Sequence, residues 1–575
     1  MATVDPKRVS DGMLSCDGGM DSGRAPNLLA PNQLAFMVNC TVRGGWPKPR
    51  PGLRKLALNF GDQEGLEDNF TTGNFQFAGA YQGDDGNLHL ISMHGGRVFR
   101  ATVGATSLAV QDISITGDLN PSNRPIAWGI QAENYFLIQD GQSKCFIYNG
   151  SASRRAGLNE VPVGRQMGYI MNRLFVANGR TYVIGDIEFG PSGTPALGYR
   201  DALLKFTENT FLNEGGSFGV PAAAGNITGI KSIANLDTVL GQGEAIITTD
   251  NMIFATQLPP DRATWKSTTQ PLQRVIQLNY GSRSQASMIN VSGDIYYRAP
   301  DGWRSLMYGV RFFGEPGQTP ISKEMNRVLE RDDPYLLQHC SAVLFDNRLL
   351  GTVSPFPTDR GIAHRGMMAL DFDLLSSMRG KLPPAYDGLW TGIDILQVVT
   401  GFYNGVERAF AFVVGCDSNI EVWEISTSDH FDHESKRIGW SFETRAFNFA
   451  NNFDLKKLQT TDLFFDELDG TVDFDIKYRP NSYPCWLDLE SWTECAKISQ
   501  CASDDLTACP TFQENKPQNR TKYHTRQPAD VFCPIEKTLL RNFFEIQFRH
   551  AFVGYCRVKQ SRYDAYVQEE GLYRT

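Results

Sequence analysis

The chain has 575 residues, of which 41% are hydrophobic and 21% charged, and its formal net charge is −9. This length fits two or three domains, and the acidic balance argues against a dedicated nucleic-acid binder, which normally has a basic surface. No stretch approaches the roughly 18 consecutive apolar residues of a membrane span, so we expect no stable membrane insertion. Residues 1–6 lack the apolar segment of a secretory signal, which predicts synthesis in a cytoplasm.

Residues 1–75 are expected to form an extended N-terminal arm. Prolines such as Pro31 and Pro51 fix φ and push the preceding residue toward extended conformations, whereas the pair Gly18-Gly19 allows a sharp turn. The pair Leu28-Leu29 and its apolar neighbours make the segment too hydrophobic for a solvated tail. Because such a segment cannot close its own core, it must lie on a domain or on a neighbouring subunit.

Short motifs follow one another in this arm in a fixed order. A paired glycine precedes a proline-flanked leucine step, an asparagine-led strand, a glycine turn and an Arg-Pro-Gly end. In this order, over residues 17–53, the sequence resembles the opening of tail nozzle proteins, also called tail tubular protein B, of short-tailed bacteriophages. The residues that we assign to this assembly arm are Gly18, Gly19, Leu28, Leu29, Pro31, Asn39, Arg50, Pro51 and Gly52.

The resemblance implies a virion structural protein that forms a hexameric ring at the distal end of a short tail. Such a ring would extend the DNA-ejection channel and dock to a tail adaptor protein and to tail fibres or spikes. Double-stranded DNA would be present only in transit. The chain departs from the family in two ways, because it is shorter than many nozzle proteins and its cysteine-rich stretch matches no motif of theirs.

Residues 76–430 show short strands separated by tight Asp, Asn and Gly turns, in units of about 40–60 residues. The first unit has strands at 77–81, 88–92 and 98–103, with a turn at 83–86. This is the pattern of four-stranded antiparallel blades, and it predicts an all-β protein with a β-propeller of six or seven blades. Stacked β-sandwiches use the same strands and turns and are the alternative.

One helix is predicted inside this region, over residues 320–331. Ser322 could cap its N-terminus, and Met325, Val328 and Leu329 would form its apolar face. We expect it to lie between blades.

Residues 431–575 are expected to form a separate C-terminal β-sandwich. Apolar and charged residues alternate over 472–478 and again over 544–549, as in half-buried strands. Asp469-Gly470 predicts a hairpin turn before the first of these strands.

Residues 485–533 are interpreted as a long insertion in this sandwich. It carries the cysteines Cys485, Cys495, Cys501, Cys509 and Cys533. Their spacings are far wider than the paired ligands of a zinc site, so no metal is predicted. Two states remain as alternatives for these cysteines. They form disulfides after a particle leaves the cell, or they stay separate reduced thiols. The insertion itself could be a tip that faces the host surface or docks a fibre.

No motif makes a positive case for an enzyme or a cofactor. Gly215–Gly219 matches G-x-S-x-G but lacks the flanking strand and helix of a nucleophile elbow, and His430 and His433 lack a third metal ligand. We therefore predict no catalytic residue. The second hypothesis is a propeller appendage or fibre adaptor that binds a host glycan or a partner protein. A propeller glycosidase is disfavoured, because no acid/base pair of carboxylates can be placed.

Overall fold

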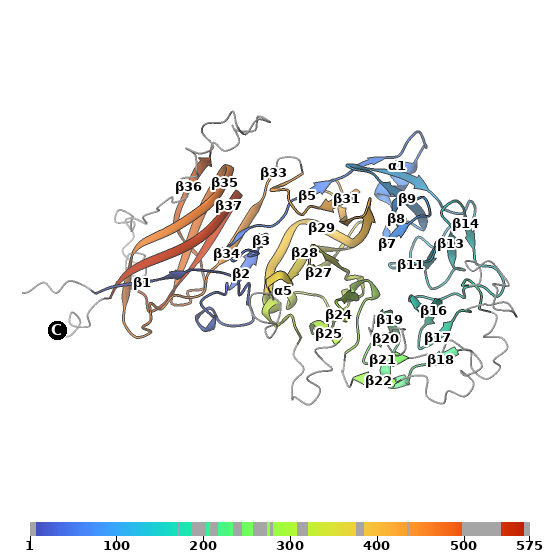
Figure 1. Ribbon diagram of the computed structural model, residues 1–575, viewed down its shortest axis with the longest axis horizontal. Helices are drawn as coiled ribbons and strands as arrows, with labels where there is room; N and C mark the ends of the chain where they lie inside the picture. Colours follow the sequence, from blue (N-terminus) through green and yellow to red (C-terminus); the bar gives the residue numbers. More distant parts are fainter. Residues whose placement is uncertain are drawn as a thin grey trace, which may run out of the picture.

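The computed structural model describes residues 7–170, 172–186, 203–206, 217–233, 244–256, 273–276, 280–306, 320–374, 385–433, 436–496 and 542–567. The protein is all-β, and long C-terminal strands lie beside a β-propeller (Figure 1). Throughout these ranges, no helix has the length and the apolar character needed to cross a bilayer.

Five separate sheets of three to five strands follow one another along the chain as propeller blades. The first contains β7 (Phe75–Gln82), β8 (Leu88–His94), β9 (Arg97–Val103), β10 (Ser107–Asp112) and, parallel to β10, β6 (Ala57–Asn59). The second contains β11 (Trp128–Ala132), β12 (Tyr135–Gln139), β13 (Phe146–Tyr148) and β14 (Ser153–Arg155). The other three contain β15 (Met167–Ile170), β16 (Arg173–Asn178), β17 (Thr181–Ile184) and β18 (Ser217–Gly219); β19 (Ile227–Ile233), β20 (Glu244–Thr249), β21 (Ile253–Thr256) and β22 (Gln273–Ile276); and β23 (Ile289–Val291), β24 (Asp294–Ala299) and β25 (Gly302–Ser305).

Glycines on the first strands of the blades allow neighbouring blades to pack closely. A Cβ atom on Gly129 of β11 would lie 2.4 Å from Cζ of Phe77 on β7. A Cβ atom on Gly168 of β15 would lie 2.7 Å from Cγ2 of Ile230 on β19. Because real Cβ contacts are never this short, an apolar side chain of one blade fills the space that a side chain on the next would need.

A sixth, 13-stranded sheet connects the blades to the C-terminal strands. β29 (Ala385–Tyr403) is its longest propeller strand, and its two halves pair with β28 and with β30. On the propeller side the other strands are β26 (Ala342–Phe345), β27 (Arg348–Thr358), β28 (Gly361–Asp371), β30 (Val406–Val414), β31 (Ile420–Ile425) and β5 (Leu53–Lys55). Beyond β2 (Phe36–Val38) it continues with β34 (Gly439–Glu443), β37 (Ile546–Val567), β35 (Lys456–Pro480), β36 (Leu487–Ala496) and β1 (Arg8–Met13).

The C-terminal strands differ from the expectation at two points. The hairpin predicted at Asp469-Gly470 is wrong, because β35 runs through it with a register shift against β37, and Gly470 adopts a φ of +67°. One glycine in a left-handed conformation makes a bulge here, not a turn. Phe544 precedes β37 and is 43% exposed, whereas the predicted burial of Val472 and Ile476 is confirmed.

The remaining elements are short. Two ribbons pair β3 (Cys40–Thr41) with β4 (Lys48–Pro49) and β32 (Phe431–Asp432) with β33 (Lys436–Arg437). The helical turns are η1 (Pro26–Leu28), α1 (Leu66–Thr72), η2 (Ala222–Ala224), η4 (Gln285–Ser287), η5 (Lys323–Met325), α5 (Asn326–Leu329) and η6 (Leu337–His339). Ser322 stands at the N-cap of η5 but makes no capping bond; its hydroxyl accepts a hydrogen bond from the Trp303 backbone N–H at 2.9 Å.

Candidate functional site

The N-terminal arm lies along its own chain and pairs with strands from distant parts of it. β1 is antiparallel to β37, and β2 lies between β29 and β34. Further along, β5 is antiparallel to β31 at the edge of the 13-stranded sheet, and β6 is parallel to β10 of the first blade. The arm therefore connects the propeller to the C-terminal strands.

The paired glycine at the start of the arm fits a close approach between backbones. The backbone N–H of Met20 donates a hydrogen bond to the Tyr386 carbonyl at 2.9 Å. Gly19 has a φ of +65°, and a Cβ atom on it would lie 2.7 Å from that same carbonyl oxygen. A Cβ atom on Gly18 would lie 2.9 Å from the Asn32 carbonyl oxygen. A larger residue at either position would move the arm away from β29 or from itself.

Asn39, Arg50 and Asp432 form a buried polar group that we call the Arg50 clasp. The Arg50 side chain is 1% exposed, and its guanidinium bonds both Asp432 carboxylate oxygens, at 2.8 and 2.9 Å. Its Nε donates to Oδ1 of Asn39 at 3.0 Å, and the same oxygen accepts the Thr391 backbone N–H at 2.7 Å. The clasp therefore ties the arm to β29 and to β32.

The end of the motif continues this contact. The Pro51 carbonyl accepts a hydrogen bond from Nη1 of Arg50 at 2.9 Å. The Gly52 N–H donates to the Asp429 carbonyl at 2.8 Å, and a Cβ atom on Gly52 would lie 2.0 Å from the Phe431 carbonyl oxygen. Only glycine allows the two backbones to come this close.

Two other predicted arm residues face solvent. Leu28 is 69% exposed and Pro31 is exposed, whereas Leu29 is buried. Leu28 and Pro31 are therefore the members of the predicted set that another molecule could contact directly.

A second polar network at the arm was missed by the sequence analysis. Arg43 bonds both oxygens of Asp371, at 2.8 and 3.0 Å, and one oxygen of Asp346 at 2.9 Å. Arg348 bonds Asp387 at 3.0 Å, and burial raises the pKa of Asp387 while the Arg348 charge opposes this. These carboxylates lie some 300 residues from Arg43, so no local pattern marks the network.

Two of the predicted cysteines, Cys485 and Cys495, lie among the described residues. Cys485 is an exposed free thiol, and Cys495 stands opposite Thr471 in the β35–β36 pair. Cys501, Cys509 and Cys533 lie outside the described residues. Seven of the described cysteines are free thiols: Cys16, Cys40, Cys145, Cys340, Cys416, Cys485 and Cys556.

The structure gives no catalytic or metal-binding role to the described residues of the weaker motifs, the histidine pair and the G-x-S-x-G segment. The His430 ring stacks on Tyr555 with 3.8 Å between centroids, and burial lowers the pKa of His430. Within the described ranges, no three His, Cys, Asp or Glu side chains are placed to hold a metal ion. Ser217 begins β18, a short edge strand, and Gly215 and Gly216 lie outside those ranges.

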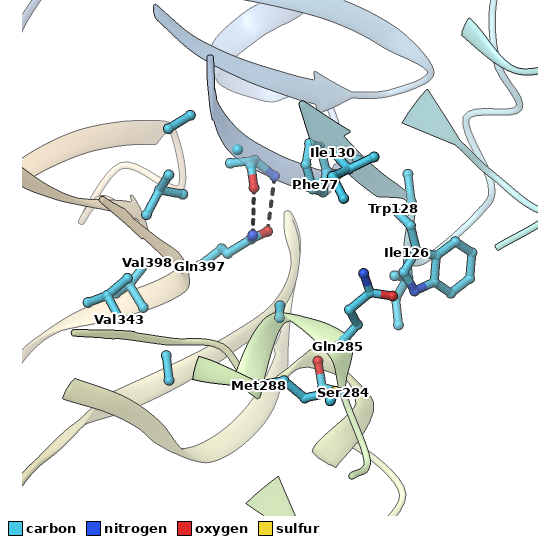
Figure 2. A pocket seen from close by; sticks show the side chains of 18 of the residues that line it. Phe77, Ile126, Trp128, Ile130, Ser284, Gln285, Met288, Val343, Gln397 and Val398 are labelled. Atoms are coloured by element: carbon cyan, nitrogen blue, oxygen red, sulfur yellow. Dashed lines mark hydrogen bonds between the residues drawn. The ribbon is translucent and has the colours of Figure 1, made fainter. Parts of the chain in front are cut away.

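A cavity of about 540 Å³ lies where the first strands of the blades meet (Figure 2). Phe77, Trp128 and Val398 line it from β7, β11 and β29. Gln397 bridges two of these strands, because its amide donates to the Ala78 carbonyl at 2.6 Å and accepts the Ala78 N–H at 3.0 Å. Gln397 therefore joins two strands of the wall, and the size of the cavity is that of a small-molecule site.

Comparisons with known proteins bear on the fold alone. No family model matches the chain, and no curated protein matches it. Among solved structures it is similar to the extracellular domain of the hybrid two component system BT4673 from B. thetaiotaomicron, at 12% identity and a TM-score of 0.34 over 73% of this chain and 45% of that one. It thus spans less than half of that protein. BamB from Moraxella catarrhalis is 8% identical, with a TM-score of 0.32 over 67% of this chain and 93% of that one.

Proposed function

We propose that this protein is a structural component of a bacteriophage tail, a nozzle-like ring protein of the virion. It extends the DNA-ejection channel and docks to an adaptor protein and to fibres. No catalytic role belongs to this proposal. The observation that carries it is the opening motif over residues 17–53. Its Gly18, Gly19, Gly52, Asn39 and Arg50 make specific contacts in the structure.

The finer architecture belongs to the same proposal. We infer seven blades: β26, β27, β28 and the first half of β29 form a sixth, and the second half of β29 with β30, β31 and β5 forms a seventh. Support comes from the cavity lining, to which seven successive parts of the chain contribute, from β7, β11, β15, β19, residues 284–290, residues 338–343 and β29. We also infer that β1 and β34–β37 fold into a sandwich, whose core would hold Met13, Trp440 and Phe474.

The cavity along the propeller axis cannot itself be the DNA conduit. Its volume of about 540 Å³ suits a small molecule, not a duplex. In a nozzle-like assembly, the lumen would lie between several copies of the chain arranged in a ring.

Native mass spectrometry of the full chain tests the proposal. We expect a discrete ring of about six copies, as a closed cyclic assembly requires. Removing the arm would unfold the protein, so the informative change is Leu28→Asp, which adds a charge at an exposed arm residue. It should shift the ring toward monomers, whereas Leu158→Asp, at a residue that is 91% exposed on the propeller, should not. A wild-type protein that stays monomeric at every concentration contradicts the ring.

A glycan-binding appendage is the second candidate, and a groove on the C-terminal strands favours it. The groove has a volume of about 400 Å³ and combines Asn27, Leu28, Asn452, Asn481 and Phe544. Amides and an aromatic ring are the groups that bind sugar hydroxyls and sugar faces. A glycan array decides: binding that is lost in Phe544→Ala and kept in Phe453→Ala, outside the groove, would support the appendage.

A further inference from the structure

The cavity where the first strands of the blades meet, which we call the axial cavity, has an unusual charge pattern for this protein. The whole chain has a net charge of −9, yet the described residues that line the cavity include no Asp, Glu or Arg. The titratable side chains among them, apart from Tyr169, are Lys231 on β19 and His339 on η6. Burial lowers the pKa of His339 to about 4, so this histidine is neutral near pH 7. Lys231 is therefore the one charged group that the described lining offers.

Lys231 has no ionic partner among the described residues. Burial lowers the pKa of its ammonium group, and no nearby carboxylate opposes this effect. A desolvated ammonium without a counter-ion is unfavourable, and an anion beside it would favour the charged form. The protein keeps such a group in a cavity whose volume of about 540 Å³ falls within the usual range for ligand sites.

We propose that the axial cavity binds a small organic carboxylate, with Lys231 as the partner of its negative charge. The apolar part of the ligand packs against the aromatic and aliphatic wall, to which Phe77, Trp128 and Met288 belong (Figure 2). This inference goes beyond the structural role proposed above, since a ring protein needs no such ligand.

The polar side chains around the wall limit what else could bind. Gln397 is bonded on both sides to Ala78, and Asn290 donates to the Ser232 carbonyl at 3.0 Å. Gln285 donates its amide to the Met167 carbonyl, which leaves its buried Oε1 without a donor. For a ligand rich in hydroxyl groups, the amides of Gln397 and Asn290 are therefore already occupied. An amphipathic acid fits better, because it needs one cation and an apolar wall.

Fluorine NMR of the full chain tests this with 4-fluorobenzoate and its neutral analogue 4-fluorobenzamide. We expect line broadening of the benzoate signal by the wild type and much weaker broadening of the benzamide signal. Lys231→Met should weaken benzoate binding by roughly tenfold or more, which corresponds to the loss of one charge-assisted hydrogen bond. Lys231→Arg should retain binding, and so should the control Lys436→Met, at an exposed residue of β33.

Three results would overturn the proposal. The first is equal binding of the acid and the amide to the wild type. The second is unchanged binding of 4-fluorobenzoate to a folded Lys231→Met. The third is that neither 4-fluorobenzoate nor hexanoate binds to the wild type. If Lys231→Met does not fold, Lys231→Gln and the comparison of acid with amide on the wild type give the answer. A monomeric or a ring-forming protein can give either result, so this test is independent of the tail assignment.

Discussion

Arg50 of the N-terminal arm and Asp432 of β32 form a two-point ion pair, in which Nη1 meets Oδ1 at 2.8 Å and Nη2 meets Oδ2 at 2.9 Å. Asp432 also accepts the backbone N–H of Leu53, the first residue of β5, at 2.8 Å. The pair thus sets the position at which the arm joins the edge of the sheet.

Replacing Arg50 with methionine should lower the free energy of unfolding by about 3 kcal/mol, because Asp432 would lose the partner of its charge. The free energy of unfolding of Arg50→Lys should lie between those of Arg50→Met and the wild type, since a lysine cannot bond both oxygens in the same plane. Urea unfolding followed by circular dichroism measures this. Arg24→Met, at a side chain that is 55% exposed, is the control. Equal stability of Arg50→Met and Arg24→Met would contradict the clasp.

Gly52→Ala should destabilise the protein by about 3 kcal/mol, because the new Cβ would collide with the Phe431 backbone carbonyl. Gly44→Ala is the matched control in the same arm. Gly44 has a φ of +92° but no atom within 4 Å of an added Cβ, so it should cost only about 1 kcal/mol of backbone strain. Thermal unfolding of both variants checks the order. If the two variants have the same melting temperature, the close approach at Gly52 is not maintained in solution.

Asp564 on β37 should make the β1–β37 contact sensitive to acid. Burial opposes its ionisation, but hydrogen bonds from Ser10, Arg8 and Thr460 outweigh burial and lower the pKa of its carboxyl from 3.8 to about 2. The unfolded chain therefore binds a proton at a higher pH than the folded protein does. Stability from this group is present above about pH 4 and is lost as the pH falls toward 2.

The corresponding variant is Asp564→Asn. The stability difference between this variant and the wild type should be large near neutral pH and should narrow as the pH falls below about 4. Urea midpoints along a pH series measure it. Asp62→Asn, at an exposed turn, should show no such narrowing. A difference that stays constant down to acid pH would contradict the assignment of the shift to Asp564.

Native alkylation with iodoacetamide should separate the thiols by exposure. Cys416 and Cys485 are exposed and should react first, whereas Cys16, Cys40 and Cys556 are buried and should react only in urea. Burial also raises the pKa of these three thiols, which leaves little reactive thiolate. Peptide mass spectrometry identifies the labelled sites. If Cys485 needs prior reduction, it is in a disulfide in the purified protein.

The blade strands could be predicted because their signals are local. The expected strands at 88–92 and 98–103 correspond to β8 and β9, which extend one or two residues further. Alternating apolar residues and Gly or Asp turns determine such ribbons within about ten residues. The all-β class and the propeller follow from their repetition. The turn at Asp469-Gly470 failed because the same two residues suit a bulge as well as a hairpin.

The contacts of the arm could not be predicted, because their partners are distant in the sequence. Arg43 finds Asp371 and Asp346 more than 300 positions away. The position of β2 between β29 and β34 likewise depends on three segments that only the folded chain brings together. Lys231 was also missed, since a single lysine in a strand resembles a solvated surface residue until the neighbouring blades surround it.

The pairing of β1 with β37 has a consequence for biosynthesis. Arg8 stands opposite Tyr566, so β1 has no partner until the ribosome has made β37. At translation rates of about 5–20 residues per second, this delay is roughly half a minute to two minutes. During that time the five separate blades can form from their own hairpins, while the arm and the edges of the 13-stranded sheet have no partners. Chaperones that cover exposed strand edges would therefore act on this chain during its synthesis, until β37 is available to pair with β1.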